Sequence, residues 1–102
     1  MLIYEVRLSV DAAVAAAYRA WLLAHVPDVL ATGCFTRADV FDEPPEAGRV
    51  RFAVHYHAPD ADRFARYERE HALRLRAEGL ALFAGRFTAE RRVLTRAETF
   101  AP

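Results

Sequence analysis

The sequence has no lysine, asparagine or glutamine, and its 102 residues include a single cysteine, Cys34, and four histidines. One cysteine excludes an internal disulfide and is typical of a reducing compartment, so we expect a cytoplasmic protein. One cysteine and four scattered histidines also lack the paired ligand spacing of a zinc site, and we predict no bound metal. No feature of the sequence around Cys34 would activate its thiol, so we assign it no reactive role.

Excess charge and long apolar runs are absent as well. The 14 basic and 14 acidic residues cancel, and a chain without basic excess lacks the electrostatic footprint of a nucleic-acid-binding protein. No apolar run reaches the roughly 18 residues of a membrane helix. The first residues, MLIYEVRL, have neither the basic start nor the long apolar core of a signal peptide. We therefore predict no nucleic-acid partner and no membrane partner.

What is present is a regular alternation of apolar and polar residues in four segments, which is typical of half-buried strands. Between them lie segments rich in alanine and charge that favour helices. We predict strands at 2–10, 34–42, 49–58 and 86–96, with helices at 12–25 and 60–82 and a hairpin turn at EPPEAG. This β-α-β-β-α-β order predicts an α+β, ferredoxin-like sandwich, with both helices on one face of a four-stranded antiparallel sheet. We expect one domain over residues 1–97 and a flexible tail at 98–102.

The segment WLLAHVPDVLATG, residues 21–33, is irregular for a helix. The apolar stripe of the first helix ends on His25, and Pro27 follows where a continuing helix would disfavour it. We therefore predict that the helix ends at His25 and that a short turn, residues 27–32, is closed by Gly33. Two interpretations of His25 stay open. It is a structural cap, where the helix dipole favours a protonated imidazole, or a general acid or base at a cavity mouth.

Aromatic side chains lie on the faces of helices and strands that should pack together, namely Trp21, Tyr18, Tyr56 and Tyr67. Packing accounts for them, and they would line a pocket if a cavity separates helices from sheet. His71 follows Tyr67 by one helical turn, so it is either a hydrogen-bonded core histidine or a pocket residue. In a haem protein it would be a natural axial ligand. Nothing else in the sequence indicates porphyrin, and we predict no cofactor.

The opposite face of the strands carries polar side chains, among them Arg51, His55 and His57. One interpretation is a solvated sheet face, which needs no function. The other is that two sheets pair face to face and enclose these residues in a dimeric barrel. A metal on His55 and His57 would need a third ligand, for which Glu5 and Glu90 are the available carboxylates, and we favour a dimer seam instead.

The pattern W-x3-H-V-P-D-V-L-A-T-G-C-F at residues 21–35 resembles the signature of an uncharacterised bacterial family, in which the first helix ends in His-Ile-Pro-Glu-Val-Leu-x-Thr-Gly-x-Phe. The later segments YHAP, RYEREHALRLR and LFAGRF resemble that family too, so the likeness covers nearly the whole chain. Cys34 stands where the family usually has a charged residue, which speaks against a catalytic cysteine. The resemblance implies a ferredoxin-like fold in the dimeric α/β-barrel group, and a homodimer formed through the sheet face.

The shorter element W-x3-H-x-P is similar to one in EthD-like proteins, which share the dimeric barrel with antibiotic-biosynthesis monooxygenases. That group also includes polyketide cyclases, lactone isomerases and haem-dependent enzymes. The resemblance implies a protein that binds or converts a small aromatic or polyketide-like molecule in its cavity. His25 would then act as the acid or base, with Trp21 and Tyr56 in the wall. The alternative is a non-enzymatic homodimer with a ligand-sensing or structural role, and the sequence leaves open whether the chain is an enzyme.

Overall fold

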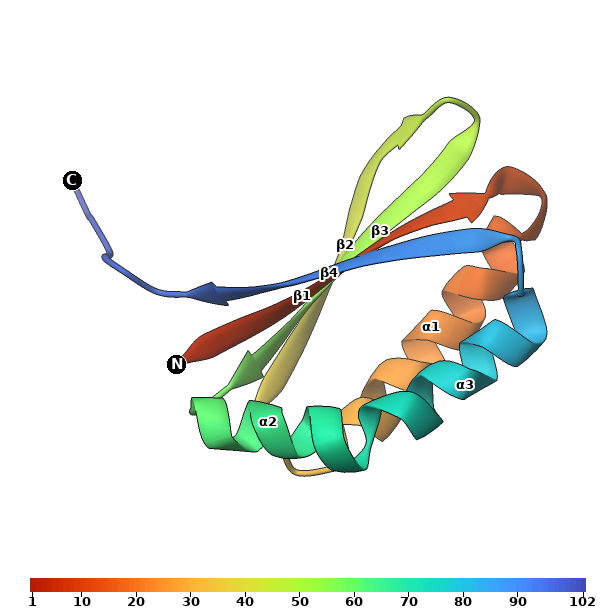
Figure 1. Ribbon diagram of the computed structural model, residues 1–102. Coiled ribbons are helices and arrows are strands. Elements are labelled where there is room, and N and C mark those ends of the chain that lie inside the picture. The colour runs from red at the N-terminus through yellow and green to blue at the C-terminus, as the bar shows by residue number, and fades with distance from the viewer.

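Four strands and three α-helices make up the computed structural model, which describes residues 1–102 (Figure 1). In chain order they are β1 (Leu2–Asp11), α1 (Ala15–Leu30), β2 (Arg37–Glu46), β3 (Arg49–Ala58), α2 (Ala61–Glu70), α3 (Ala72–Phe83) and β4 (Phe87–Thr95), with a 3-10 turn at Ala12–Val14. The strands form one antiparallel sheet in the order β2-β3-β1-β4. The α+β class and the β-α-β-β-α-β order are confirmed, except that the second predicted helix is divided into α2 and α3.

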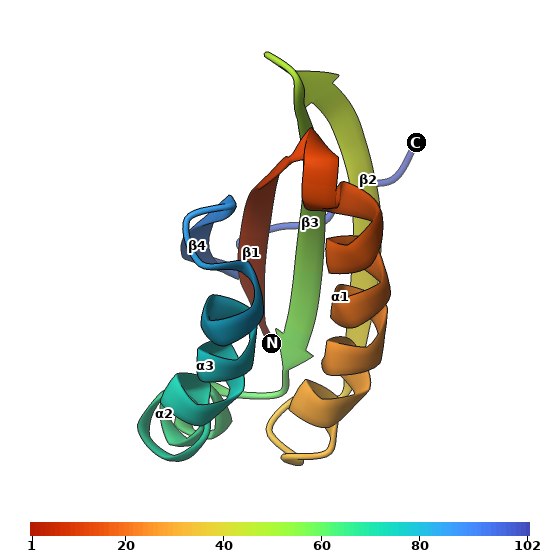
Figure 2. The ribbon, with the colours of Figure 1, turned by 90° about the vertical axis from the view of Figure 1, so that its right-hand side faces the viewer.

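All three helices cover one face of the sheet and leave the other face bare (Figures 1 and 2). Side chains alternate between the two faces of β1, and Tyr4, Val6 and Leu8 point toward the helices, where all three are buried. Among the most deeply buried large side chains are Tyr18 and Phe52, one from a helix and one from the sheet. Each buried side chain of this size stabilises the fold by about 1.5–3 kcal/mol, so the layer between helices and sheet is the core.

Helix α1 does not end at His25, and that prediction is wrong. The helix runs to Leu30 with Pro27 inside it. Proline removes one hydrogen bond to the preceding turn, but Pro27 lies on the exposed side, where water satisfies the freed carbonyl. Val26 and Val29 are buried on the other side and hold the last turns against the core. Gly33 then ends the segment with φ 77° and donates its N–H to the carbonyl of Leu30, at 3.1 Å.

The second helical segment breaks at His71, where φ is −128° and ψ is −33°, so the single helix predicted for residues 60–82 is wrong. The buried residues explain the break. Tyr67 is buried in α2, and Ala72 and Leu75 are buried in α3. On one straight helix Tyr67 and Ala72 would point about 140° apart, at roughly 100° per residue. The break lets the buried residues of α2 and those of α3 both face the core, and His71 lies between the two helices.

The β2–β3 hairpin is tighter than predicted, because β2 continues through most of EPPEAG to Glu46. Only Ala47 and Gly48 form the turn, with φ of 52° and 74°, as a two-residue turn between twisted strands requires. Pro44 and Pro45 fall at an irregularity in the pairing, which an edge strand tolerates. At its other end β2 begins at Arg37, three residues later than predicted, because Cys34 and Phe35 are buried in the preceding connection.

After β4, residues 96–102 have no regular secondary structure and extend away from the sheet (Figure 1). None of the helices is long and apolar enough to span a membrane.

Candidate functional site

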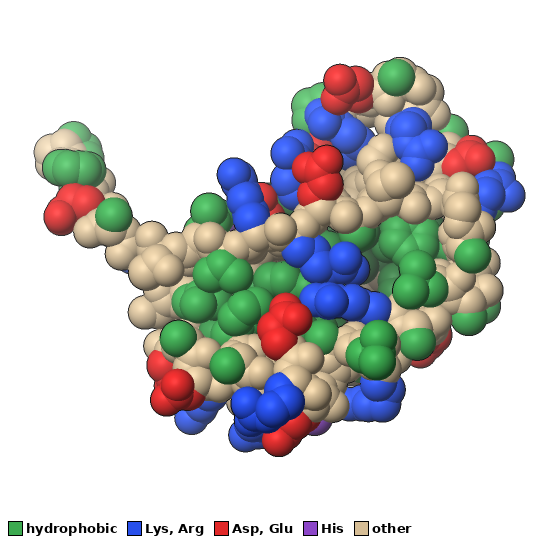
Figure 3. Space-filling model, in the orientation of Figure 1, with side chains coloured by type: hydrophobic (Ala, Val, Ile, Leu, Met, Phe, Trp, Pro, Cys, Tyr) green, Lys and Arg blue, Asp and Glu red, His purple; other side chains and the backbone are tan.

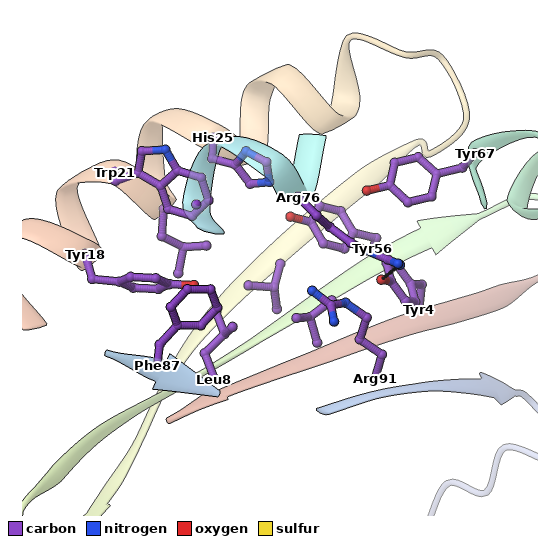
Figure 4. Close-up of a pocket in the computed structure, with 14 residues that line it drawn as sticks. Tyr4, Leu8, Tyr18, Trp21, His25, Tyr56, Tyr67, Arg76, Phe87 and Arg91 are labelled. Atoms are coloured by element: carbon purple, nitrogen blue, oxygen red, sulfur yellow. Dashed lines mark hydrogen bonds between the residues drawn. The ribbon is translucent and has the colours of Figure 1, made fainter. Parts of the chain in front are cut away.

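A cavity of about 50 Å³ opens between the helix-facing side of the sheet and helices α1 and α3 (Figure 4). That volume exceeds the ~10–15 Å³ needed to hold a water molecule. Ten of its 14 lining residues are hydrophobic. The lining includes Trp21, Tyr18, Tyr56, Tyr67 and His25. These five residues come from α1, β3 and α2, so the fold brings together side chains that are far apart in the sequence.

Aromatic rings pack closely along the wall formed by α1. The ring of Tyr18 lies 5.0 Å from that of Phe83 and 5.1 Å from that of Phe87, measured between centroids. It also stacks on Phe52 in the sheet, at 6.4 Å. Edge-on and offset contacts of this kind are favourable aromatic geometries, and they hold the wall in place from both sides.

Trp21 is fixed by two contacts with α3. Its indole N–H donates to Oε1 of Glu78 at 2.8 Å. Its ring also lies against the backbone at Gly79, where an added Cβ would be 2.8 Å from the indole Cη2 atom. Glycine inside a helix costs about 1 kcal/mol relative to alanine, and here the close approach of the indole requires it.

His25 lies in the interior of α1 and is not a C-terminal cap, because the helix continues for five more residues. The expectation that the helix dipole favours its protonated form therefore fails. Its ring stacks on Trp21 with centroids 4.5 Å apart and planes inclined by 20°. Burial lowers the pKa of His25, outweighing the opposite effect of Glu78 and Asp28. The imidazole is thus mainly neutral at pH 7 and has a nitrogen free to accept a proton.

Three tyrosines border the cavity without a hydrogen-bond partner in the protein for their hydroxyl groups: Tyr18, Tyr56 and Tyr67. Burial raises the pKa of Tyr18 and of Tyr67 to about 12, and it raises the pKa of Tyr56 as well. These hydroxyls therefore keep their protons at neutral pH and can donate hydrogen bonds to a bound molecule.

Arg76 and Arg91 also line the cavity, and the sequence analysis did not single them out. A signal for Arg91 was present, because it occupies the apolar register of β4 together with Phe87 and Ala89. A charged residue in a row that faces the core is an exception to the strand pattern. Arg76 carried no such signal, because it lies on a helix with many arginines.

His71 lies outside the cavity, although the sequence placed it on the inner stripe of one long helix. It borders a separate surface pocket of about 460 Å³ with Asp28, Arg74 and Leu75. Arg74 donates to its Nδ1 at 2.9 Å, so Nε2 carries the proton of the neutral ring. That Nε2 is buried without a hydrogen-bond partner. The break between α2 and α3 is what moves His71 away from the aromatic wall.

Arg51, His55 and His57 lie on the bare face of the sheet, each paired with an acidic side chain. His55 Nε2 is 2.8 Å from Glu5, His57 Nε2 is 3.1 Å from Asp39, and Arg51 is 2.9 Å from Glu46. The histidines are therefore held by different carboxylates. No group of three or more His, Cys, Asp or Glu side chains is arranged to hold a metal ion.

Glu5 is the buried centre of this face, with a residue exposure of 6%. Its carboxylate accepts hydrogen bonds from Arg92 at 2.6 Å and pairs with His55. Burial alone would raise the pKa of Glu5, but the hydrogen bonds from Arg92 and His55 lower it overall. The pKa of Asp39 is lowered as well, mainly by its hydrogen bond from Arg37. The bare face is thus an ordered array of ion pairs.

Solved structures with the same fold include natural proteins of similar length. A mutant of SnoaB, a cofactor-independent oxygenase from Streptomyces nogalater, matches with a TM-score of 0.71 and 16% identity, over 99% of this chain and 98% of that chain. A dimeric ferredoxin-like protein from an uncultured marine organism matches with a TM-score of 0.60 and 9% identity, over 100% of both chains. The de novo designed protein Foldit4 matches with a TM-score of 0.61 and 18% identity, over 93% and 97%.

These likenesses establish the ferredoxin-like fold, and at such low identity they establish nothing about activity. A family model described as "Domain of unknown function (DUF4286)" matches residues 1–97. A search of curated protein sequences finds no match.

Proposed function

We propose that this chain, which belongs to the DUF4286 family of domains of unknown function, is a homodimer that binds a small aromatic or polyketide-like molecule in the cavity between its sheet and helices. The observation that carries the proposal is the lining of that cavity. An apolar pocket with a few convergent polar groups is the usual form of a small-molecule site. Here Trp21 and Tyr56 provide aromatic walls, while His25 and the tyrosine hydroxyls provide the polar groups.

We further propose that His25 exchanges a proton with the bound molecule. Its ring borders the cavity and its pKa is lowered by burial, which suits a proton acceptor at neutral pH. The stacked Trp21 fixes the orientation of the imidazole. One solved structure of this fold is a cofactor-independent oxygenase, so the fold can support catalysis without a cofactor.

The proposed dimer forms through the bare face of the sheet. That face contains the solvent-exposed Phe41, whose ring meets His55 edge-on at 5.0 Å. Most of its charges are paired within one chain, Glu90 being an exception, and this pairing lowers the cost of burying them against a second sheet. The fold likeness to a dimeric ferredoxin-like protein supports a dimer. The lone Cys34 supports a cytoplasmic location for the dimer.

The single tryptophan provides a direct test, because Trp21 lies in the cavity wall. We expect an uncharged aromatic probe, 2-naphthalenemethanol, to raise the melting temperature through preferential binding to the folded state and to change the emission of Trp21. 4-Nitrophenol, a phenol acidic enough to ionise near neutral pH, tests His25, because its ionised form has a distinct absorption band. We expect the bound phenol to be ionised to a greater extent at pH 7 in the wild type than in His25→Gln. If no naphthalene derivative of any charge alters either signal, the proposed binding function is wrong.

A ligand-sensing or structural homodimer is the alternative, and the small volume of the cavity, about 50 Å³, favours it. A sensor would bind the probe with the same ionised fraction of 4-nitrophenol in the wild type and in His25→Gln, and binding would change the dimer. A structural dimer would bind no probe at all.

A further inference from the structure

Two arginines reach the same cavity from different layers of the molecule. Arg76 extends from α3 and Arg91 from the helix-facing side of β4, and both lie toward the Tyr4 end of the cavity, away from Trp21 and Tyr18 (Figure 4). No aspartate or glutamate is among the 14 lining residues. In a chain with net charge zero, this end of the cavity therefore carries a local positive charge.

Arg91 is placed there by strand register. It pairs across the sheet with Val6, and its neighbours on the same side of β4 are Ala89 and Val93. It makes no ion pair and no hydrogen bond within the protein, whereas Arg92, on the opposite side of the same strand, is bonded to Glu5. Its charge acts on the pKa of Tyr18, Tyr56 and Tyr67, opposing the larger effect of burial in each. Arg91 is exposed to solvent and is thus a cation without a protein partner at the rim of the cavity.

Arg76 is held in position, but one of its hydrogen-bond donors has no acceptor. Its Nη2 donates to the hydroxyl of Tyr4 at 2.7 Å and to Glu68 at 3.3 Å. Its Nε–H is buried without an acceptor, and an unmet buried donor is unfavourable until an acceptor reaches it. Because Glu68 balances part of its charge, Arg91 is the freer of the two cations.

A groove of about 210 Å³ lies beside the cavity at the β4 edge, and Arg76, Arg91 and Phe87 line both. Figure 3 shows this region from outside, with basic side chains at the centre of the furrow between sheet and helices and apolar surface on both sides. A ligand that occupies either space would therefore contact both guanidinium groups.

We infer that the ligand is a flat apolar ring system bearing an anionic oxygen group, a carboxylate in the simplest case, and that Arg91 together with the Arg76–Tyr4 pair binds that group. Guanidinium groups bind carboxylates with strong, charge-assisted hydrogen bonds, and the tyrosine hydroxyls add further donors. The inference rests on the proposed binding function and adds the chemical class of the ligand.

Calorimetric titrations with three naphthalene probes of the same shape test the inference. 2-Naphthoate is anionic, 2-naphthalenemethanol is neutral and 2-naphthylmethylammonium is cationic. We expect the wild type to bind the acid about tenfold or more tightly than the alcohol, as a charged hydrogen bond predicts, and to bind the amine most weakly. Arg91→Met should remove most of the preference for the acid and leave alcohol binding unchanged, whereas Arg91→Lys should keep a substantial part of it.

Arg63→Met is the matched control, because Arg63 is an exposed arginine of α2 whose side chain makes no bond within the protein. It removes the same charge from a residue outside the cavity lining and should leave all three affinities unchanged. Equal affinity of the wild type for acid and alcohol would overturn the anion inference while leaving the binding function intact. An equal loss of acid binding in Arg63→Met and Arg91→Met would also overturn it, because the preference would then arise from overall charge. Failure of all three probes to bind would instead overturn the proposed function itself.

Discussion

Trp21 and Gly79 face each other across the contact between α1 and α3, so closely that a Cβ atom on Gly79 would lie 2.8 Å from the indole Cη2 and 3.2 Å from Cζ2. The hydrogen bond from the indole N–H to Glu78 holds the ring from the neighbouring position. The indole cannot move away without losing this bond or its stacking on His25. This one close approach therefore sets both the spacing of the two helices and the orientation of the cavity wall.

Gly79→Ala should destabilise the protein, although alanine is the better helix former. Overpacking a tight contact costs about 1–3 kcal/mol, which exceeds the roughly 1 kcal/mol gained in helix propensity. Urea unfolding followed by far-ultraviolet circular dichroism measures the change, including in variants that lack Trp21. The double variant Trp21→Leu/Gly79→Ala should be less destabilised than the two single changes predict together, because the smaller side chain leaves room for the methyl group. Strict additivity would show that the contact does not limit the helix spacing.

The lowered pKa of His25 predicts a pH dependence of stability. Because the folded pKa lies below the unfolded value of about 6.5, the unfolded state takes up a proton first as the pH falls. The contribution of His25 to stability is therefore complete above pH 6.5 and decreases as the pH falls from there toward the folded pKa. Urea unfolding between pH 7.5 and 5 should show this decrease in the wild type and a smaller one in His25→Gln. An NMR titration with a His25 midpoint above 6.5 would contradict the prediction.

Glu5 predicts a second pH effect, in a more acidic range. Its folded pKa is lowered below 4.5, so its stabilising contribution is present above pH 4.5 and is lost as the pH falls through the folded pKa. Glu5→Gln should reduce the free energy of unfolding at pH 7 by about 1–3 kcal/mol, the cost of weakening a buried hydrogen-bonded group. The difference from the wild type should shrink at pH 3.

Glu90→Gln is the control for this prediction, because Glu90 is exposed on the same sheet face and has no hydrogen-bond partner. It should change stability by no more than about 0.5 kcal/mol. Equal effects of Glu5→Gln and Glu90→Gln would show that the buried network does not stabilise the sheet.

Three of the four strands were predicted well because a period of two is a local signal, whereas β2 begins three residues and ends four residues later than predicted. β3 begins and ends at the predicted residues, and β1 and β4 differ by one residue at most at each end. The helices were harder to predict, because their ends depend on tertiary packing. The buried side chains of Val26 and Val29 carry α1 past Pro27, and the need to bury both Tyr67 and Ala72 breaks the second helix.

The residues of the candidate site, like the helices and strands, were predicted only in part. Residue type and stripe position selected Trp21 and Tyr56, and the structure places both in the cavity lining. His71 was selected by the same reasoning and lies elsewhere, because helical spacing assumes a continuous helix. Arg91 was missed although it interrupts an apolar row, because a strand pattern identifies the core-facing positions and does not show what a polar residue among them contacts.

The exposed apolar side chain of Phe41 leads to a prediction of where the dimer forms. It is 45% exposed on the bare sheet face, next to His55 and across from the buried Ala53. If two sheets pair through this face, Phe41→Arg places an unpaired charge in the interface and should convert the dimer to a monomer. Leu73→Arg adds the same charge on the helical side, where Leu73 is 84% exposed, and should leave the dimer unchanged. Light scattering at equal concentrations distinguishes the dimer from the 11.5 kDa monomer. A monomeric wild type would refute the dimer itself, and loss of the dimer in Leu73→Arg alone would move the interface to the helices.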